Sequence, residues 1–212
     1  MIVYQARQVK NREDFQCQLD TLDRAYVAHY PWGGTFQPKT YACLGWDTQG
    51  LHLYMRSYEA PVREEASQDN GDIYMDSCME FFFNPIPQER ADMFINLEMN
   101  PRRYLYLACG TPDQRTLLTS ERYSRFKLDI RDKGSWEGKE YWDVLASIPF
   151  AFIQEHAPGF AAGPGARMTG NFFKCGDETP YPHFGCWSDI DPIPGKEPSF
   201  YRPDCFGEIV LV

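Results

Sequence analysis

The sequence predicts an all-β protein: one antiparallel β-sandwich of the jelly-roll type, spanning residues 1–212, with one or two short helices. Three observations support this fold class. Short strand-like runs, rich in aromatic side chains, recur at intervals typical of a sandwich. Sixteen Gly and sixteen Pro are scattered between them as turn residues. Helical periodicity is confined to two stretches.

Composition and charge exclude several classes of protein. A chain of 212 residues, 43% of them hydrophobic, can bury one full core. The formal charge of −9 would repel phosphate backbones, so we expect no nucleic-acid partner. No apolar stretch reaches the roughly 18 residues of a membrane span, so we expect no membrane partner either.

The N-terminus and the cysteines bear on cellular location. Residues 1–14 contain neither the apolar segment nor the cleavage site of a signal peptide. The seven cysteines are odd in number and include no CxxC pair, so we expect reduced thiols and no zinc site. The chain is therefore predicted to be cytoplasmic, although a secreted protein without its leader would look the same. The sequence leaves the choice between a monomer and a homodimer open.

Two stretches predict the helices. Residues 12–29 carry apolar side chains at helical spacing, and residues 149–157 begin with Pro149, a favourable residue for a first helical turn. The apolar positions of the first stretch are Phe15, Leu19, Leu22 and Tyr26.

The strands are predicted by alternation and by turn residues. Residues 40–47 and 50–59 flank the turn "TQG" and predict a hairpin with Leu51, Leu53 and Met55 on its apolar face. Further strands are predicted at 78–84, 93–100, 103–110, 123–130, 141–149, 168–175, 183–189 and 206–212.

The hairpin formed by residues 77–84 and 93–100 carries the most informative pattern. Side chains alternate across a strand, so Phe81, Phe83, Ile95, Leu97 and Met99 form an apolar face that must pack inside the sandwich. The opposite face collects Glu80, Asn96 and Glu98. Carboxylates and amides beside aromatic rings suit a sugar, whose hydroxyls need hydrogen bonds and whose ring faces stack. A solvated face without function is the alternative.

The two glutamates allow a catalytic interpretation as well. A pair of carboxyl groups is the machinery of a glycoside hydrolase, in which their separation decides the stereochemical outcome. Spacing along the sequence does not fix that separation, so a hydrolase that uses Glu80 and Glu98 stays an alternative to binding.

Two loops offer further candidate sites. Residues 167–190 combine Asn171, Lys174 and Trp187 with several aromatic residues, which favours a binding rim, although Trp187 could equally plug the core. Residues 67–72, "SQDNGD", form an oxygen-rich loop that could bind calcium or could be a solvated turn.

Three segments, in order along the chain, resemble family 9 carbohydrate-binding modules. The run "DSCMEFFFNP" followed by "NLEMNP" resembles the "D-S-V-E-x-F" hairpin of that family. The run "YACLGWDTQGLHLYMRSYE" resembles its early hairpin, and "CWSDI" with "PSFYRPDCFGEIVL" resembles its C-terminal end. The wider group includes DOMON-like domains, which bind sugars or haem on a β-sandwich.

This resemblance implies non-catalytic binding of a mono- or oligosaccharide. Members of the family are usually appended to secreted enzymes, and because no leader is seen here we expect a stand-alone module instead. The resemblance also implies calcium as a structural ion and a sugar held between two tryptophans. Glu80 matches the motif glutamate, Tyr74 and Phe200 (or Tyr201) stand where the tryptophans are expected, and Ile95 replaces an arginine. The predicted ligand-binding residues are Glu80, Asn96, Glu98, Tyr74, Asn171, Lys174, Trp187 and Phe200. A protein-interaction module that has lost sugar binding is the remaining alternative.

Overall fold

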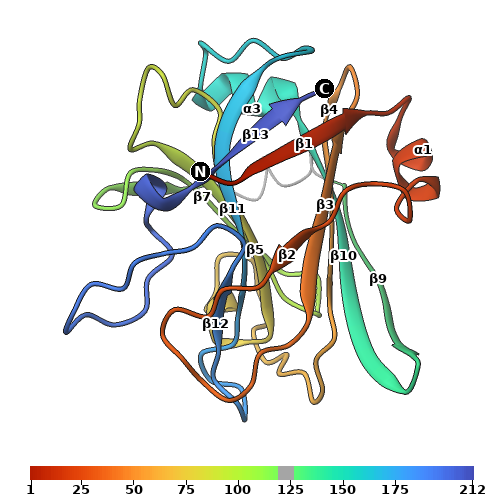
Figure 1. Ribbon diagram of the computed structural model, residues 1–212, viewed down its shortest axis with the longest axis vertical. Coiled ribbons are helices and arrows are strands. Elements are labelled where there is room, and N and C mark those ends of the chain that lie inside the picture. Colours follow the sequence, from red (N-terminus) through yellow and green to blue (C-terminus); the bar gives the residue numbers. More distant parts are fainter. Residues whose placement is uncertain (119–126) are drawn as a thin grey trace.

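A computed structural model describes residues 1–118 and 127–212 (Figure 1). The regular elements of the described residues are mostly β-strands, with two short helices and two 3₁₀ turns. The strands are β1 (Val3–Gln8), β2 (Ala25–Val27), β3 (Thr40–Trp46), β4 (Gly50–Ser57), β5 (Cys78–Asn84), β6 (Phe94–Met99), β7 (Leu105–Gly110), β8 (Arg115–Leu117), β9 (Lys127–Trp136), β10 (Lys139–Pro149), β11 (Arg167–Cys175), β12 (Phe184–Cys186) and β13 (Gly207–Leu211). The helices are α1 (Arg12–Cys17) and α3 (Phe150–His156), and the turns are η1 (Ile73–Met75) and η2 (Pro203–Cys205).

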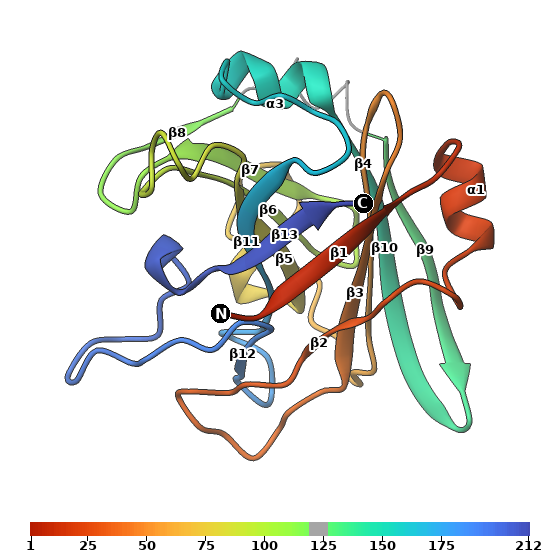
Figure 2. The ribbon, with the colours of Figure 1, turned by 45° about the horizontal axis from the view of Figure 1, so that its top comes forward.

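The strands follow one another as β8-β7-β6-β5-β11-β13-β1-β3-β4-β10-β9, with β12 beside β11 and β2 beside β3. Strand β1 joins the two halves of this arrangement. One half is β8-β7-β6-β5-β11-β13 and the other is β3-β4-β10-β9. The first residues of β1, Val3–Ala6, pair in parallel with β13, and Arg7 and Gln8 pair in parallel with β3. The other strand pairs in the described residues are antiparallel. Figure 2 shows β13 and β1 lying side by side between the two halves.

The main core lies between the two halves, as expected for a sandwich. Phe81 stacks on Phe83 and on Phe172, with ring centroids 4.8 and 4.9 Å apart. Leu53 and Val144 reach the same core from the other half. A second apolar cluster covers the opposite face of β5 and β11, which is the face that matters for the site. The predicted β-sandwich is therefore confirmed, with a mixed strand pairing at β1.

Most of the predicted strands are present at nearly the predicted bounds. The hairpin of β3 and β4 pairs Leu44 with Leu53, and the hairpin of β5 and β6 pairs Phe81 with Leu97. Of the strand predicted at 123–130, residues 123–126 lie outside the described residues, and β9 begins at Lys127. Three strands, β1, β2 and β8, were not predicted, because they are short or carry polar side chains on one side.

The first predicted helix is much shorter than its pattern suggested. Helix α1 begins after Asn11, whose side chain accepts a hydrogen bond from the N–H of Asp14, and it ends at Cys17. Tyr26 lies in β2, paired with Tyr41, so its helical spacing was coincidental. The second helix, α3, follows Pro149 as predicted. No helix in the described part of the chain has the length and apolar character needed to cross a membrane.

Candidate functional site

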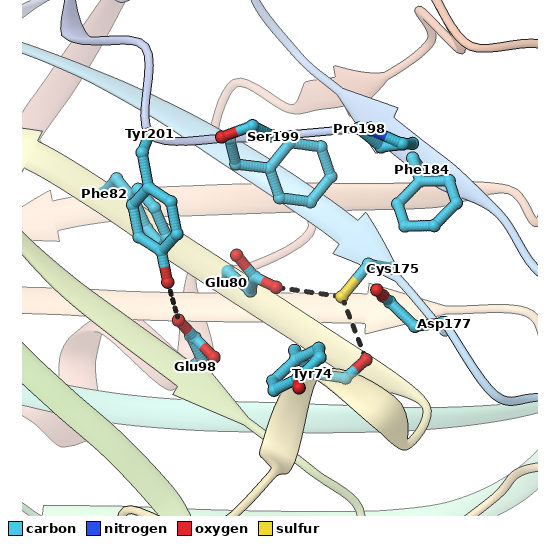
Figure 3. Close-up of a pocket in the computed structure, with 11 residues that line it drawn as sticks. Tyr74, Glu80, Phe82, Glu98, Cys175, Asp177, Phe184, Pro198, Ser199 and Tyr201 are labelled. Carbon is cyan, nitrogen blue, oxygen red and sulfur yellow. Dashed lines mark hydrogen bonds between the residues drawn. The ribbon is translucent and has the colours of Figure 1, made fainter. Parts of the chain in front are cut away.

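A pocket of about 220 Å³ lies on the outer face of β5, β6 and β11, away from the main core. Residues from η1, β5, β6, the end of β11, β12 and the loop at 198–201 surround it (Figure 3). Its lining residues are Tyr74, Glu80, Phe82, Glu98, Cys175, Asp177, Phe184, Pro198, Ser199, Phe200 and Tyr201. Acidic groups and a thiol form its polar part, and aromatic rings form its walls.

Strand register brings the polar groups together. Glu80 on β5 lies directly opposite Glu98 on β6 and opposite Phe173 on β11. Residues two apart along a strand share a face, so Cys175 reaches the same pocket as Glu80. The intervening residues of these strands point into the main core. The alternation seen in the sequence of β5 is thus what places a carboxylate on the pocket floor.

Both glutamates are almost excluded from solvent, with 2% and 3% exposure for Glu80 and Glu98. Burial raises the pKa of Glu80 to about 7, and the nearby Asp177 adds to that rise. The pKa of Glu98 is raised well above its usual value by burial and then by the charge of Glu80. Two buried acids side by side therefore hold protons at a pH where exposed carboxyl groups are ionised.

Neighbouring side chains orient these acids. The Cys175 thiol donates a hydrogen bond to Glu80 Oε1 at 2.9 Å. Asn96 Nδ2 and the Tyr201 hydroxyl donate to Glu98 Oε1, at 3.1 and 3.4 Å. Figure 3 shows the Tyr201 side chain directed toward Glu98 from the opposite wall of the pocket. The acids thus have fixed positions, as a binding site for a small polar ligand requires.

The aromatic walls are packed against the strands. Phe200 stacks on Phe173 with centroids 4.2 Å apart and planes 9° apart, and Tyr201 stacks on Phe82 at 5.5 Å. Tyr74 is different, since it keeps 39% of its surface exposed at the pocket edge. Its ring is available to stack on a ligand.

The "DS" dipeptide of the sequence motif supports that edge. The Asp76 carboxylate is fully buried and accepts hydrogen bonds from Arg63 Nη1 (2.5 Å), the Glu65 N–H (2.9 Å) and Asn100 Nδ2 (2.9 Å). These bonds tie the loop before η1 to β6, and η1 carries Tyr74. The motif aspartate is a positioning residue here, outside the pocket lining.

The structure brings five of the eight predicted site residues together. Tyr74, Glu80, Glu98 and Phe200 line the pocket, and Asn96 lies beneath it, fully buried and bonded to Glu98. Their role in holding a ligand stays a prediction.

Asn171 and Trp187 lie elsewhere. Asn171 shares the pocket face of β11, but its amide donates to the Ser188 carbonyl and accepts from the N–H groups of Trp187 and Ser188. Trp187 is buried in the main core, edge-on to Tyr4 and against Phe172. These residues anchor one chain segment to β11, which does not fit a binding rim.

Lys174 points to the opposite face of β11, which does not fit a contact to the pocket. Its neighbour in register is Met79, a core residue. The ammonium group is fully buried, 3.0 Å from Glu59 Oε2 and 2.8 Å from His183 Nε2. Asn171 and Lys174 are three residues apart, so alternation alone places them on opposite faces.

Sequence reasoning missed several pocket residues. Cys175 and Asp177 follow the polar face of β11, and alternation from Phe173 would have identified Cys175. Arg115 of β8 lies with its guanidinium 3.8 Å from the ring centroid of Tyr201 and lowers the pKa of Glu98 against the effect of burial. Pro198 and Ser199 come from a loop whose position no strand pattern indicates.

The loop at 67–72 uses its oxygen atoms for structure. Asp69 Oδ1 accepts from the Leu105 N–H and Asn70 Oδ1 from the Leu107 N–H, both at 3.0 Å. Within the described ranges, three His, Cys, Asp or Glu donors converge at Cys78, Glu80 and Cys175, not in this loop. These hydrogen bonds fit the structural turn that the sequence offered as the alternative to a calcium site.

Comparison with solved structures supports the fold. A candidate carbohydrate-binding protein from Bacteroides uniformis is 26% identical, with a TM-score of 0.83 and coverage of 99% of each chain. A family 9 module from Caldicellulosiruptor kristjanssonii in complex with cellotriose is 16% identical, with a TM-score of 0.63 and coverage of 99% of this chain and 93% of the module. Its complex with glucose gives 16% identity, a TM-score of 0.65 and coverage of 100% and 96%.

No protein with a curated description matches the chain. The model of carbohydrate-binding family 9 matches residues 16–211, which is nearly the full length. The match includes β5 and β6, with Glu80 and Glu98, and the last strand, β13. On this evidence of sequence and fold together, the chain belongs to carbohydrate-binding family 9.

Proposed function

We propose that the protein binds a carbohydrate in the pocket of β5, β6 and β11, without catalysis. The observation that carries this proposal is the placement of Glu80 and Glu98 on a pocket floor walled by aromatic rings. Their oxygens accept hydrogen bonds from sugar hydroxyls, and Tyr74 offers an exposed ring face for stacking.

Family membership supports binding over hydrolysis, since the family is one of binding modules. Glucose and cellotriose are bound by the Caldicellulosiruptor module, so glucose and short β-linked glucose oligomers are the ligands to test first. A pocket of about 220 Å³ is suited to one sugar ring rather than to the middle of a long chain.

Haem binding, known in the wider group, has less support. The lining residues of the pocket include neither Met nor His, the side chains expected as axial ligands. The pocket is also lined by three acidic groups, Glu80, Glu98 and Asp177, which favour hydroxyl-rich ligands.

Isothermal titration calorimetry with glucose and cello-oligosaccharides tests the proposal. Glu80→Ala removes a hydrogen-bonding acid from the floor and should weaken binding by about 1–3 kcal/mol, or about 5- to 150-fold. Glu140→Ala, at an exposed glutamate of β10, is the matched control and should bind like the wild type.

Two results would overturn the proposal. Unchanged affinity in a folded Glu80→Ala protein would move the site away from this pocket. Release of reducing sugar by the wild type, abolished in Glu80→Gln and Glu98→Gln, would show a hydrolase instead of a binding protein.

A further inference from the structure

A cluster of potential metal ligands lies at the inner end of the pocket. Donor atoms of Cys78, Glu80 and Cys175 all lie within 4.8 Å of one another, and all three side chains are buried. Their spacing in the sequence hides the cluster, since Cys175 comes from a strand nearly one hundred residues later. The expectation of no zinc site was drawn from the absence of a local CxxC pair, which does not test such a cluster.

Strand pairing explains why these groups meet. Cys78 and Cys175 are direct partners across the antiparallel pair of β5 and β11. Glu80 follows two residues after Cys78 on the same face, and its Oε1 is 2.9 Å from the Cys175 sulfur. The ligand atoms therefore sit on rigid strands, not on loops, which is how a preorganised metal site is built.

A fourth donor faces the group from the pocket side. Figure 3 shows the Cys175 sulfur between the carboxylates of Glu80 and Asp177. Asp177 follows the end of β11; it lies outside the 4.8 Å group of donors, and its carboxylate faces the Cys175 sulfur (Figure 3). Glu80, Cys175 and Asp177 all line the pocket, so an ion has a path to the site.

The two thiols of the cluster carry protons at neutral pH. Burial raises the pKa of Cys78 to about 12 and that of Cys175 well above its usual value, and the charge of Glu80 adds to both shifts. Burial likewise raises the pKa of Asp177 to about 6. A divalent ion must displace the thiol protons, so its binding releases protons and strengthens as the pH rises.

We propose that Cys78, Cys175, Glu80 and Asp177 form a site for a thiophilic divalent cation of the Zn²⁺ class. Two sulfur and two carboxylate donors match the tetrahedral preference of zinc, with Zn–S near 2.3 Å and Zn–O near 2.0–2.2 Å. Ligand atoms around one such ion lie about 3.5 Å apart. The Cys175–Glu80 pair must open by a few tenths of an ångström, and the remaining donors must move inward.

The proposed metal site and the proposed sugar site share Glu80. They differ in their interactions, because an ion is held by thiolate and carboxylate ligands and a sugar by hydrogen bonds and stacking. An ion held here would fix the Glu80 carboxylate and reduce its capacity to accept hydrogen bonds from a ligand. Metal binding is therefore measured without sugar, on the reduced full-length protein. Failure of metal binding then leaves the carbohydrate proposal unaffected.

The first experiment is titration of the reduced, chelator-treated protein with Co²⁺ as a spectroscopic probe, followed by Zn²⁺ displacement. We expect thiolate-to-cobalt charge transfer in the near ultraviolet, visible bands of tetrahedral Co²⁺, and loss of both at one equivalent of Zn²⁺. Absence of the charge-transfer band in the wild type overturns the proposal without any variant. A free-thiol assay beforehand shows that Cys78 and Cys175 are reduced.

Variants then assign the ligands. Cys78→Ala and Cys175→Ala should each lower Zn²⁺ affinity by more than about 100-fold, since even outer-shell substitutions reach that size. Cys43→Ala, at a buried cysteine of another cluster, is the matched control and should bind Zn²⁺ like the wild type. If a cysteine variant does not fold, Glu80→Gln serves in its place. Zn²⁺ uptake that persists unchanged in a folded Cys78→Ala protein is surface binding and overturns the assignment.

Discussion

Lys174 Nζ lies 3.0 Å from Glu59 Oε2, and both side chains are excluded from solvent. The pair joins β11 to the segment after β4, on the core side of the sheet. Glu59 also accepts hydrogen bonds from Trp142 Nε1 at 3.0 Å and Ser77 Oγ at 2.9 Å. The charge of Lys174 lowers the pKa of Glu59 against the effect of its burial. This ion pair therefore belongs to the framework beneath the pocket.

Lys174→Met should destabilise the fold by about 3–5 kcal/mol, because it leaves the Glu59 carboxylate buried without its cation. Urea denaturation followed by tryptophan fluorescence measures this loss. Lys139→Met, at an exposed lysine of β10, should change the free energy of unfolding by no more than about 0.5 kcal/mol. The sugar affinity of the folded Lys174→Met protein should match that of the wild type. A selective loss of affinity would indicate that Lys174 contributes to sugar binding.

Acid should destabilise the protein through His183. Burial and the charge of Lys174 lower the pKa of this side chain to about 4, from 6.5 in an unfolded chain. Its Nδ1–H donates to the Tyr181 carbonyl and its Nε2 accepts from Lys174, so the ring is neutral when folded. Between pH 6.5 and about 4 the unfolded state binds more protons, so stability falls as the pH falls.

The neutral His183 ring contributes at most about 3 kcal/mol to this pH dependence of the free energy of unfolding. The contribution is fully present above pH 6.5 and is lost as the pH falls to about 4. Unfolding free energies measured from pH 7.5 to 4 in wild type and in His183→Gln separate it from other acidic groups. We expect the stability of His183→Gln to fall less over this interval. Parallel curves for the two proteins would contradict the buried, neutral state of the ring.

Tyr74→Ala should weaken sugar binding with little effect on stability. The ring is exposed at the pocket edge, so its removal costs a stacking contact of about 0.5–1.5 kcal/mol, or about 2- to 10-fold in affinity. Tyr26→Ala removes a ring of similar exposure (45%) on β2 and should leave affinity unchanged. Equal changes in sugar affinity for the two substitutions, measured by calorimetry, would show that Tyr74 does not contact the ligand.

Asp76→Ala should destabilise the loop that supports the pocket edge. The change leaves Arg63 and several N–H donors without their buried acceptor, at a cost of about 3–5 kcal/mol. Asp113→Ala, at an exposed turn, is the control. Hydrogen exchange should increase in residues 63–66, and unchanged protection there would contradict the positioning role of Asp76.

Alternation predicted the part of the site that lies within one hairpin. Side chains alternate between the two faces of β5 and β6, and this alternation predicts that Glu80 and Glu98 share a face. The register of the hairpin places the two residues directly opposite each other. The apolar residues Phe81 and Leu97 were assigned to the core for the same reason. Local rules were sufficient where both strands are adjacent in sequence.

Contacts between distant segments were not predictable in this way. The cation of Lys174 is buried because Glu59 and His183 meet it from other parts of the chain, and no local pattern indicates such partners. Trp187 was a plausible rim residue by composition, yet Asn171 fixes its backbone so that the ring enters the core. The first helix ended early because β2 pairs with β3, a tertiary contact that overrides helical spacing.

The parallel position of β1 between β13 and β3 has a kinetic consequence. Val3 and Glu208 are neighbours in register, so β1 has no complete set of partners until residues 207–211 have been synthesised. Pairings of such long sequence separation slow folding, because the loop must close before the contacts stabilise it. A ribosome-bound chain without residues 207–211 would therefore leave one edge of β1 unpaired and open to association with other chains.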